Sequence, residues 1–89
     1  MTPKKNKLTK AQAQRIHAKR RARERYDMRL NRADLDCIVV LIKSGQSVLM
    51  SHKSNRVKEH LVIYNDTIMR VIYDSKRQNV ITFLPKREG

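Results

Sequence analysis

The sequence predicts an α+β fold in which two N-terminal helices pack on an antiparallel sheet of three or four strands. Residues 9–43 contain no glycine and no proline and place apolar residues at helical spacing. Residues 47–84 change to a spacing of two, with β-branched residues between polar turns. The length of 89 residues allows one hydrophobic core. We therefore expect a disordered basic arm over residues 1–8, a single domain over residues 9–85 and a short tail over residues 86–89.

The first predicted helix runs from residue 9, where Thr9 is a suitable N-cap, to about residue 28. One side of it carries small residues and a tyrosine, which would let the helix lie close to another element: Ala11, Ala18, Ala22 and Tyr26. An adjacent side carries His17, Arg21 and Glu24 at helical spacing and is too polar to be core.

The second predicted helix begins after Asn31, an N-cap whose capping box is completed by Asp34. It ends at residue 43, before Ser44 and Gly45. Its apolar residues have the spacing of a buried face: Leu35, Ile38, Val39 and Ile42. Cys37 is the only cysteine, which excludes an intramolecular disulfide, and we expect it to be a small buried side chain.

Four later segments have strand character: residues 47–51, 57–64, 67–74 and 79–84. Asn65 and Asp66 form a two-residue connection that tolerates positive φ, so the second and third segments should pair as a hairpin. Alternation groups three residues of the third strand on one side: Ile68, Arg70 and Ile72. In the last strand the same rule places Thr82 on the side of Val80 and Leu84.

The charge of the chain is strongly positive and unevenly distributed. The formal net charge is +13, and residues 1–32 hold twelve basic and two acidic residues. Such a field attracts polyanions, of which nucleic acid is the usual one. A membrane-binding helix would need a broad apolar face, which the first helix lacks, and no apolar run approaches the roughly 20 residues of a membrane span. With no secretory signal, we expect a cytoplasmic protein that binds RNA and no membrane.

Few kinds of chemistry are open to this chain. The acidic residues are scattered, and no cluster has the spacing of a metal site. The two glycines, Gly45 and Gly89, do not form a phosphate-binding loop, so we expect no metal and no small-molecule cofactor. What remains is RNA cleavage by attack of the 2′-hydroxyl on the adjacent phosphorus, which needs only a base, an acid and a cation.

His17 is the candidate base or acid, and Arg21, one helical turn later, is placed to bind the same phosphate. Without catalysis, the same stretch would be a phosphate-binding helix, which is the simpler interpretation of its charge. Five further cations are expected to bind nucleic acid: Lys19, Arg20, Arg23, Arg25 and Arg70.

Other polar residues allow two interpretations each. Arg56 opens the long strand and is either a loop cation or part of a phosphate site. Thr82 and Arg70 lie in largely apolar strands, where a polar side chain either faces solvent or has a function. For His60, within a strand, a structural or solvent-facing role is the simpler interpretation.

Four short stretches resemble small phage and bacterial proteins of the RelE/colicin-type metal-independent ribonuclease fold, at residues 17–26, 54–57, 71–77 and 80–85. The resemblance implies an N-terminal helix packed on a curved four-stranded sheet. It implies that His17 corresponds to a helix histidine and Thr82 to a hydroxyl residue late in the sheet. Arg21, Arg25 and Arg56 would bind the phosphate or stabilise the transition state. It also implies ribosome-associated RNA as a ligand and an acidic antitoxin as a protein partner.

The predicted function is therefore that of a toxin-like, metal-independent endoribonuclease. The alternative is a nucleic-acid-binding or host-inhibitor protein of the same fold without catalysis, whose RNA affinity would fall steeply with salt. A third interpretation is an inhibitor whose basic helix is masked by an acidic protein partner.

Overall fold

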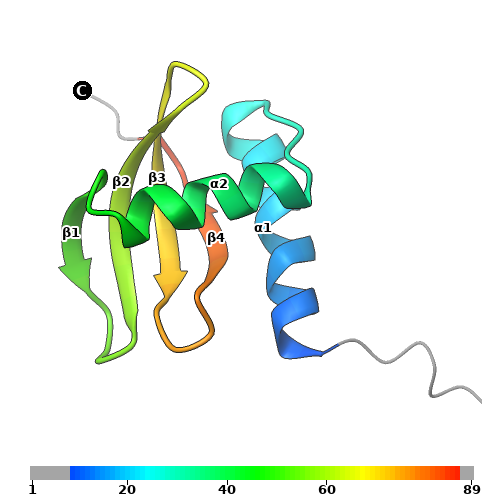
Figure 1. Ribbon diagram of the computed structural model, residues 1–89. Helices are drawn as coiled ribbons and strands as arrows, with labels where there is room; N and C mark the ends of the chain where they lie inside the picture. The colour runs from blue at the N-terminus through cyan, green and yellow to red at the C-terminus, as the bar shows by residue number, and fades with distance from the viewer. Residues whose placement is uncertain (1–8, 87–89) are drawn as a thin grey trace, which may run out of the picture.

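The computed structural model describes residues 9–86, which form two helices followed by four strands (Figure 1). The helices are α1 (Lys10–Tyr26) and α2 (Arg32–Lys43), and the strands are β1 (Val48–His52), β2 (Val57–Tyr64), β3 (Thr67–Asp74) and β4 (Asn79–Leu84). The strands pair antiparallel in the order β1-β2-β3-β4. The predicted α+β class is confirmed, with four strands. The basic arm predicted over residues 1–8 and residues 87–89 of the predicted tail lie outside the described residues.

Local hydrogen bonds fix the start of both helices. Thr9 Oγ1 accepts a hydrogen bond from the Gln12 backbone N–H at 3.0 Å, and Gln12 Oε1 accepts one from the Thr9 N–H at 2.9 Å. Asn31 and Asp34 form the same reciprocal pair at the start of α2. Each capping box satisfies two backbone N–H groups that the helix itself cannot, so the two predicted N-caps are confirmed.

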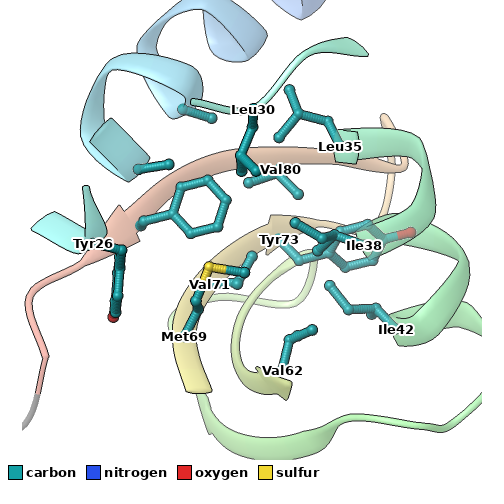
Figure 2. Close-up of a cluster of buried hydrophobic side chains, with 13 residues drawn as sticks. Tyr26, Leu30, Leu35, Ile38, Ile42, Val62, Met69, Val71, Tyr73 and Val80 are labelled. Carbon is teal, nitrogen blue, oxygen red and sulfur yellow. The ribbon is translucent and has the colours of Figure 1, made fainter. Parts of the chain in front are cut away.

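The hydrophobic core lies between α2 and one face of the sheet (Figure 2). Leu35, Ile38 and Ile42 of α2 are buried there, as their spacing predicts, against residues of three strands: Val62, Met69, Val71, Tyr73, Val80 and Phe83. Cys37 is exposed rather than buried. At about 100° per residue it lies about 160° from Leu35 around α2, on the side that faces away from the core.

Helix α1 runs beside β4, the strand at one edge of the sheet, whereas α2 crosses its face (Figure 1). Ala18 and Ala22 of α1 are fully buried, because their small side chains allow a close approach. The Tyr26 hydroxyl donates a hydrogen bond to the Leu84 carbonyl at 2.6 Å and accepts one from the Arg70 N–H at 3.0 Å. Helix α2 therefore covers one face of the sheet, while α1 packs at its edge beside β4.

The pairing of β3 with β4 contains a bulge. Tyr73 pairs with Val80, whereas its neighbour Ile72 pairs with Thr82, so Ile81 is an extra residue. The bulge reverses the alternation, and Val80 faces the core while Thr82 faces the other side. The prediction that these two residues share a side is therefore wrong. We call the face that α2 does not cover the outer face; it carries Glu59, Leu61, Ile68, Arg70, Ile72, Asp74, Asn79 and Thr82.

The β2–β3 hairpin matches its prediction, with Asn65 and Asp66 at φ values of 52° and 60°. Positive φ at both central residues is what a two-residue turn requires if it is to follow the twist of the strands.

Candidate nucleic-acid interface

A buried carboxylate, Asp74, organises one end of the outer face. Its Oδ1 accepts hydrogen bonds from the backbone N–H groups of Lys76 and Arg77 at 3.0 and 3.1 Å. Its Oδ2 lies 3.1 Å from Nη1 of Arg77 and 3.6 Å from Nη2 of Arg56. Burial alone would raise the pKa of Asp74, but the Arg77 hydrogen bonds and the charge of Arg56 outweigh it and lower the pKa. The ionised carboxylate therefore ties the β3–β4 turn to the segment before β2.

Glu59 forms a second buried ion-pair cluster on the same face. Its carboxylate lies 3.0 Å from Nε of Arg70 and 3.7 Å from Nζ of Lys53. Arg70 also donates from Nη1 to the Pro85 carbonyl at 3.1 Å. Burial opposes ionisation of Glu59, but the Arg70 hydrogen bond and the two positive charges lower its pKa. The guanidinium of Arg70 is thus held in place by two partners.

Positive charge is therefore distributed differently on the sheet and on α1. The cations beside the outer-face carboxylates are Lys53, Arg56, Arg70 and Arg77. Helix α1 carries seven Lys or Arg and one Glu, which Arg21 contacts at 2.7 Å. Arg20 and Arg23 are exposed, and neither belongs to an ion pair within residues 9–86. The cations that remain available to an external anion are thus concentrated on α1.

One flank of α1 borders the outer face. The Asn79 side chain, on that face, donates hydrogen bonds to the Ala11 carbonyl and to Oε1 of Gln14, both at 3.0 Å. At about 100° per residue, Arg21 lies about 20° and His17 about 60° from Gln14 around the helix. Both residues therefore lie on the flank that borders the outer face.

Two contacts between α1 and β4 show which residues of the helix lie level with which residues of the strand. Gln14 touches Asn79 at the start of β4, and Tyr26 touches Leu84 at its end, so α1 and β4 run in the same direction. With rises of about 1.5 Å per helical residue and 3.3 Å per strand residue, Thr82 lies level with Arg21. The helix–strand border thus brings His17, Arg21 and Thr82 to one side of the molecule.

The four predicted catalytic residues are not joined to one another in a single hydrogen-bonded site. His17 is exposed, and no hydrogen bond or ion pair within the described residues joins it to Arg21, Arg56 or Thr82. Arg56 contacts Asp74. Asp74 is paired with Asn79 between β3 and β4, and Asn79 donates a hydrogen bond to Gln14 of α1. Thr82 is half-buried opposite Ile72.

The other predicted binding cations are divided among several surfaces. Arg20 and Arg23 are exposed on α1, and Lys19 is half-buried on the side towards α2. Arg25 is half-buried, and its Nε atom is fully buried with no hydrogen-bond partner among the described residues. Arg70 lies on the outer face, bound to Glu59.

A hollow of about 300 Å³ opens on the outer face beside the end of α1. Leu61 and Ile68 give it apolar walls, and Tyr26, Arg70 and Lys86 complete the lining. Lys86 Nζ lies 5.8 Å from the centre of the Tyr26 ring. An apolar hollow with cations at its rim has the composition of a site for a planar base next to a phosphate.

His60 has a structural position. Its Nδ1 lies 2.8 Å from the Ser47 hydroxyl, and its ring meets Tyr73 edge-on with the ring centres 5.9 Å apart. Burial, together with electrostatic repulsion from Lys58 and His52, lowers the pKa of His60. The imidazole therefore lies on the face of the sheet that α2 covers, where it contacts Ser47 and Tyr73.

Sequence reasoning missed the two buried carboxylates and the Asn79–Gln14 contact. Glu59 and Asp74 are acidic residues inside otherwise apolar strands, and that placement was the available signal. A charge at such a position needs a cation, and this chain supplies several.

Within residues 9–86, no three side chains of His, Cys, Asp or Glu lie close enough to share a metal ion. Neither described helix combines the length and the apolar character that crossing a lipid bilayer requires.

Comparison with known proteins returns no match to a family model, to a curated protein or to a solved structure. The resemblance to the RelE/colicin-type fold therefore stays a prediction, and functional inference depends on the chain's own residues.

Proposed function

We propose that the protein binds RNA through the phosphate backbone, with α1 as the main contact surface. One observation supports this proposal most strongly. On the outer face of the sheet, Arg56, Arg70 and Arg77 are paired with Asp74 and Glu59. On α1, Arg20 and Arg23 are exposed and have no acidic partner among the described residues. Lys and Arg side chains in such an array replace counterions along a polyanion, which is the main source of sequence-independent affinity.

A salt titration of RNA binding tests this proposal. The double variant Arg20→Gln/Arg23→Gln removes two exposed charges, so the log–log slope of affinity against salt should become shallower by about 0.7 for each single-strand phosphate that the variant no longer neutralises. Lys76→Gln, which removes an exposed lysine from the β3–β4 turn, is the control and should leave the slope unchanged. Salt-insensitive binding by the wild-type protein, or equal slopes for all three proteins, would refute it.

A second function, metal-independent cleavage of the bound RNA, is favoured by the position of His17 at the border of α1 and the outer face. We propose that His17 acts as the general base or acid, Arg21 and Arg56 bind the scissile phosphate and Thr82 orients it. The 2′-oxygen forms a bond to phosphorus as its proton passes to the base. The bond from phosphorus to the 5′-oxygen then breaks, and the acid protonates the departing oxygen.

Cleavage is tested by incubating RNA with the protein in EDTA. Wild-type protein should cut, and His17→Ala should lose most of the activity. Both should bind RNA with similar affinity, because the substitution removes none of the Lys or Arg side chains proposed to bind the phosphate backbone. Equal cutting by the two proteins excludes His17 as a catalytic residue. Binding without cutting by the wild-type protein leaves the RNA-binding function alone.

A further inference from the structure

A second hollow, of about 250 Å³, lies between α1 and the start of α2. Four residues of α1 and the first residue of α2 line it: Gln12, Arg15, Ile16, Lys19 and Arg32. Three of the five are cations and none is acidic. The hollow thus has the charge of an anion site, contributed by two separate helices.

The cations of this hollow are incompletely neutralised. Arg15 and Lys19 are four residues apart on one helix face, a spacing at which like charges repel. Neither belongs to an ion pair within residues 9–86. Arg32 contacts Asp36 through Nε at 3.5 Å in an exposed pair, so its terminal nitrogens have no acidic partner within the same residues. An anion in the hollow would relieve the repulsion, and guanidinium groups match the oxygen geometry of phosphate.

The hollow faces the opposite side of α1 from the outer-face border. At about 100° per residue, Lys19 lies about 160° from Arg21, and Arg15 lies about 160° from His17. The exposed Arg20 occupies the arc between these two sides. Cations therefore lie on both flanks of α1 and on the exposed side between them.

We propose that this hollow binds a backbone phosphate of a second RNA segment, so that α1 lies between two strands and an RNA hairpin is preferred over a single strand. The choice of RNA as the ligand rests on the proposed function, whereas the anion site rests on the hollow itself. A helix with its side chains is about 10–12 Å wide, so a strand that follows the outer-face border leaves the opposite flank uncovered. The second strand of a hairpin covers it.

The RNA preference is tested with a hairpin and an unstructured single strand of equal length at one salt concentration. Wild-type protein should prefer the hairpin, and Arg15→Gln/Arg32→Gln should lower hairpin affinity about tenfold while reducing single-strand affinity little. The matched control, Arg20→Gln/Arg23→Gln, should lower the affinity for both RNAs by the same factor, so that the ratio of hairpin affinity to single-strand affinity stays unchanged. Equal binding of the two RNAs by the wild-type protein, or an unchanged ratio in Arg15→Gln/Arg32→Gln, overturns the two-strand proposal.

Inorganic phosphate tests the hollow independently of RNA. At constant ionic strength, replacing chloride by phosphate should shift the backbone amide signals of residues 15, 19 and 32 saturably in the wild-type protein. The signals of the same positions should not shift in Arg15→Gln/Arg32→Gln. Absence of these shifts overturns the anion site even if RNA binds elsewhere. Saturable shifts with no binding of any RNA would instead support the anion site and refute the proposed function.

Discussion

Replacing Asp74 by asparagine should destabilise the protein substantially. The asparagine retains the shape and one oxygen for the N–H groups of Lys76 and Arg77, but it lacks the charge that holds Arg56 and Arg77. Breaking a buried pair costs about 3–5 kcal/mol when the partner stays buried. Here the two arginine side chains are 43% and 29% exposed and regain water, so we expect a loss of about 2–3 kcal/mol. For a domain of this size, the melting temperature falls by about 10–20 °C.

The effect should depend on pH in a defined direction. The folded-state pKa of Asp74 is lower than its ordinary value of 3.8, so its contribution to stability is complete above that value. The contribution is lost as the pH falls through the lowered pKa. The difference in unfolding free energy between wild type and Asp74→Asn should therefore be constant near neutrality and shrink below about pH 4.

Urea unfolding followed by circular dichroism measures both effects. Asp66→Asn is the matched control, because Asp66 is exposed in the β2–β3 turn and asparagine also tolerates its positive φ. An unfolding free energy of Asp74→Asn within about 0.5 kcal/mol of that control would refute the structural role of the carboxylate.

Three further results are expected. Ala18→Leu overfills the contact between α1 and β4 and should cost about 1–3 kcal/mol in urea unfolding, whereas the same change at the exposed Ala13 should be nearly neutral. Tyr26→Phe leaves the Arg70 N–H and the Leu84 carbonyl without their hydroxyl partner and should cost about 1–3 kcal/mol in the same assay. A smaller loss would show that these two hydrogen bonds contribute little to stability. The hydrogen bond that Tyr64 donates to Asp34 raises the pKa of Tyr64 to about 12, so its tyrosinate absorbance should appear near that pH and move towards pH 10 in Asp34→Asn.

The bounds of the elements were predictable because they depend on neighbouring residues. Thr9 and Asn31 reveal the helix starts through reciprocal capping bonds within four residues of sequence. Asn65 and Asp66 likewise reveal the hairpin, because few other residue types accept positive φ at both positions.

The arrangement around the candidate site was less predictable, because it depends on contacts between distant segments. The alanines of α1 indicate close packing but not that the partner is an edge strand. A single extra residue in β4 reverses the side of Thr82, and a period of two cannot reveal it. Cys37 was predicted to be buried because its neighbours are apolar, but its position about 160° from Leu35 around α2 places it on the exposed side. The carboxylates Asp74 and Glu59 contact cations up to eighteen residues away in the sequence.

Measuring which backbone amide signals of the protein shift when RNA binds tests most directly whether α1 is the interface. With a short RNA hairpin at low salt, the largest shifts should fall on residues 15–25, with smaller shifts at Arg32 and Thr82. Shifts confined to β1 and the β2–β3 hairpin, with the signals of α1 unchanged, would contradict the assignment of the interface to the basic helix.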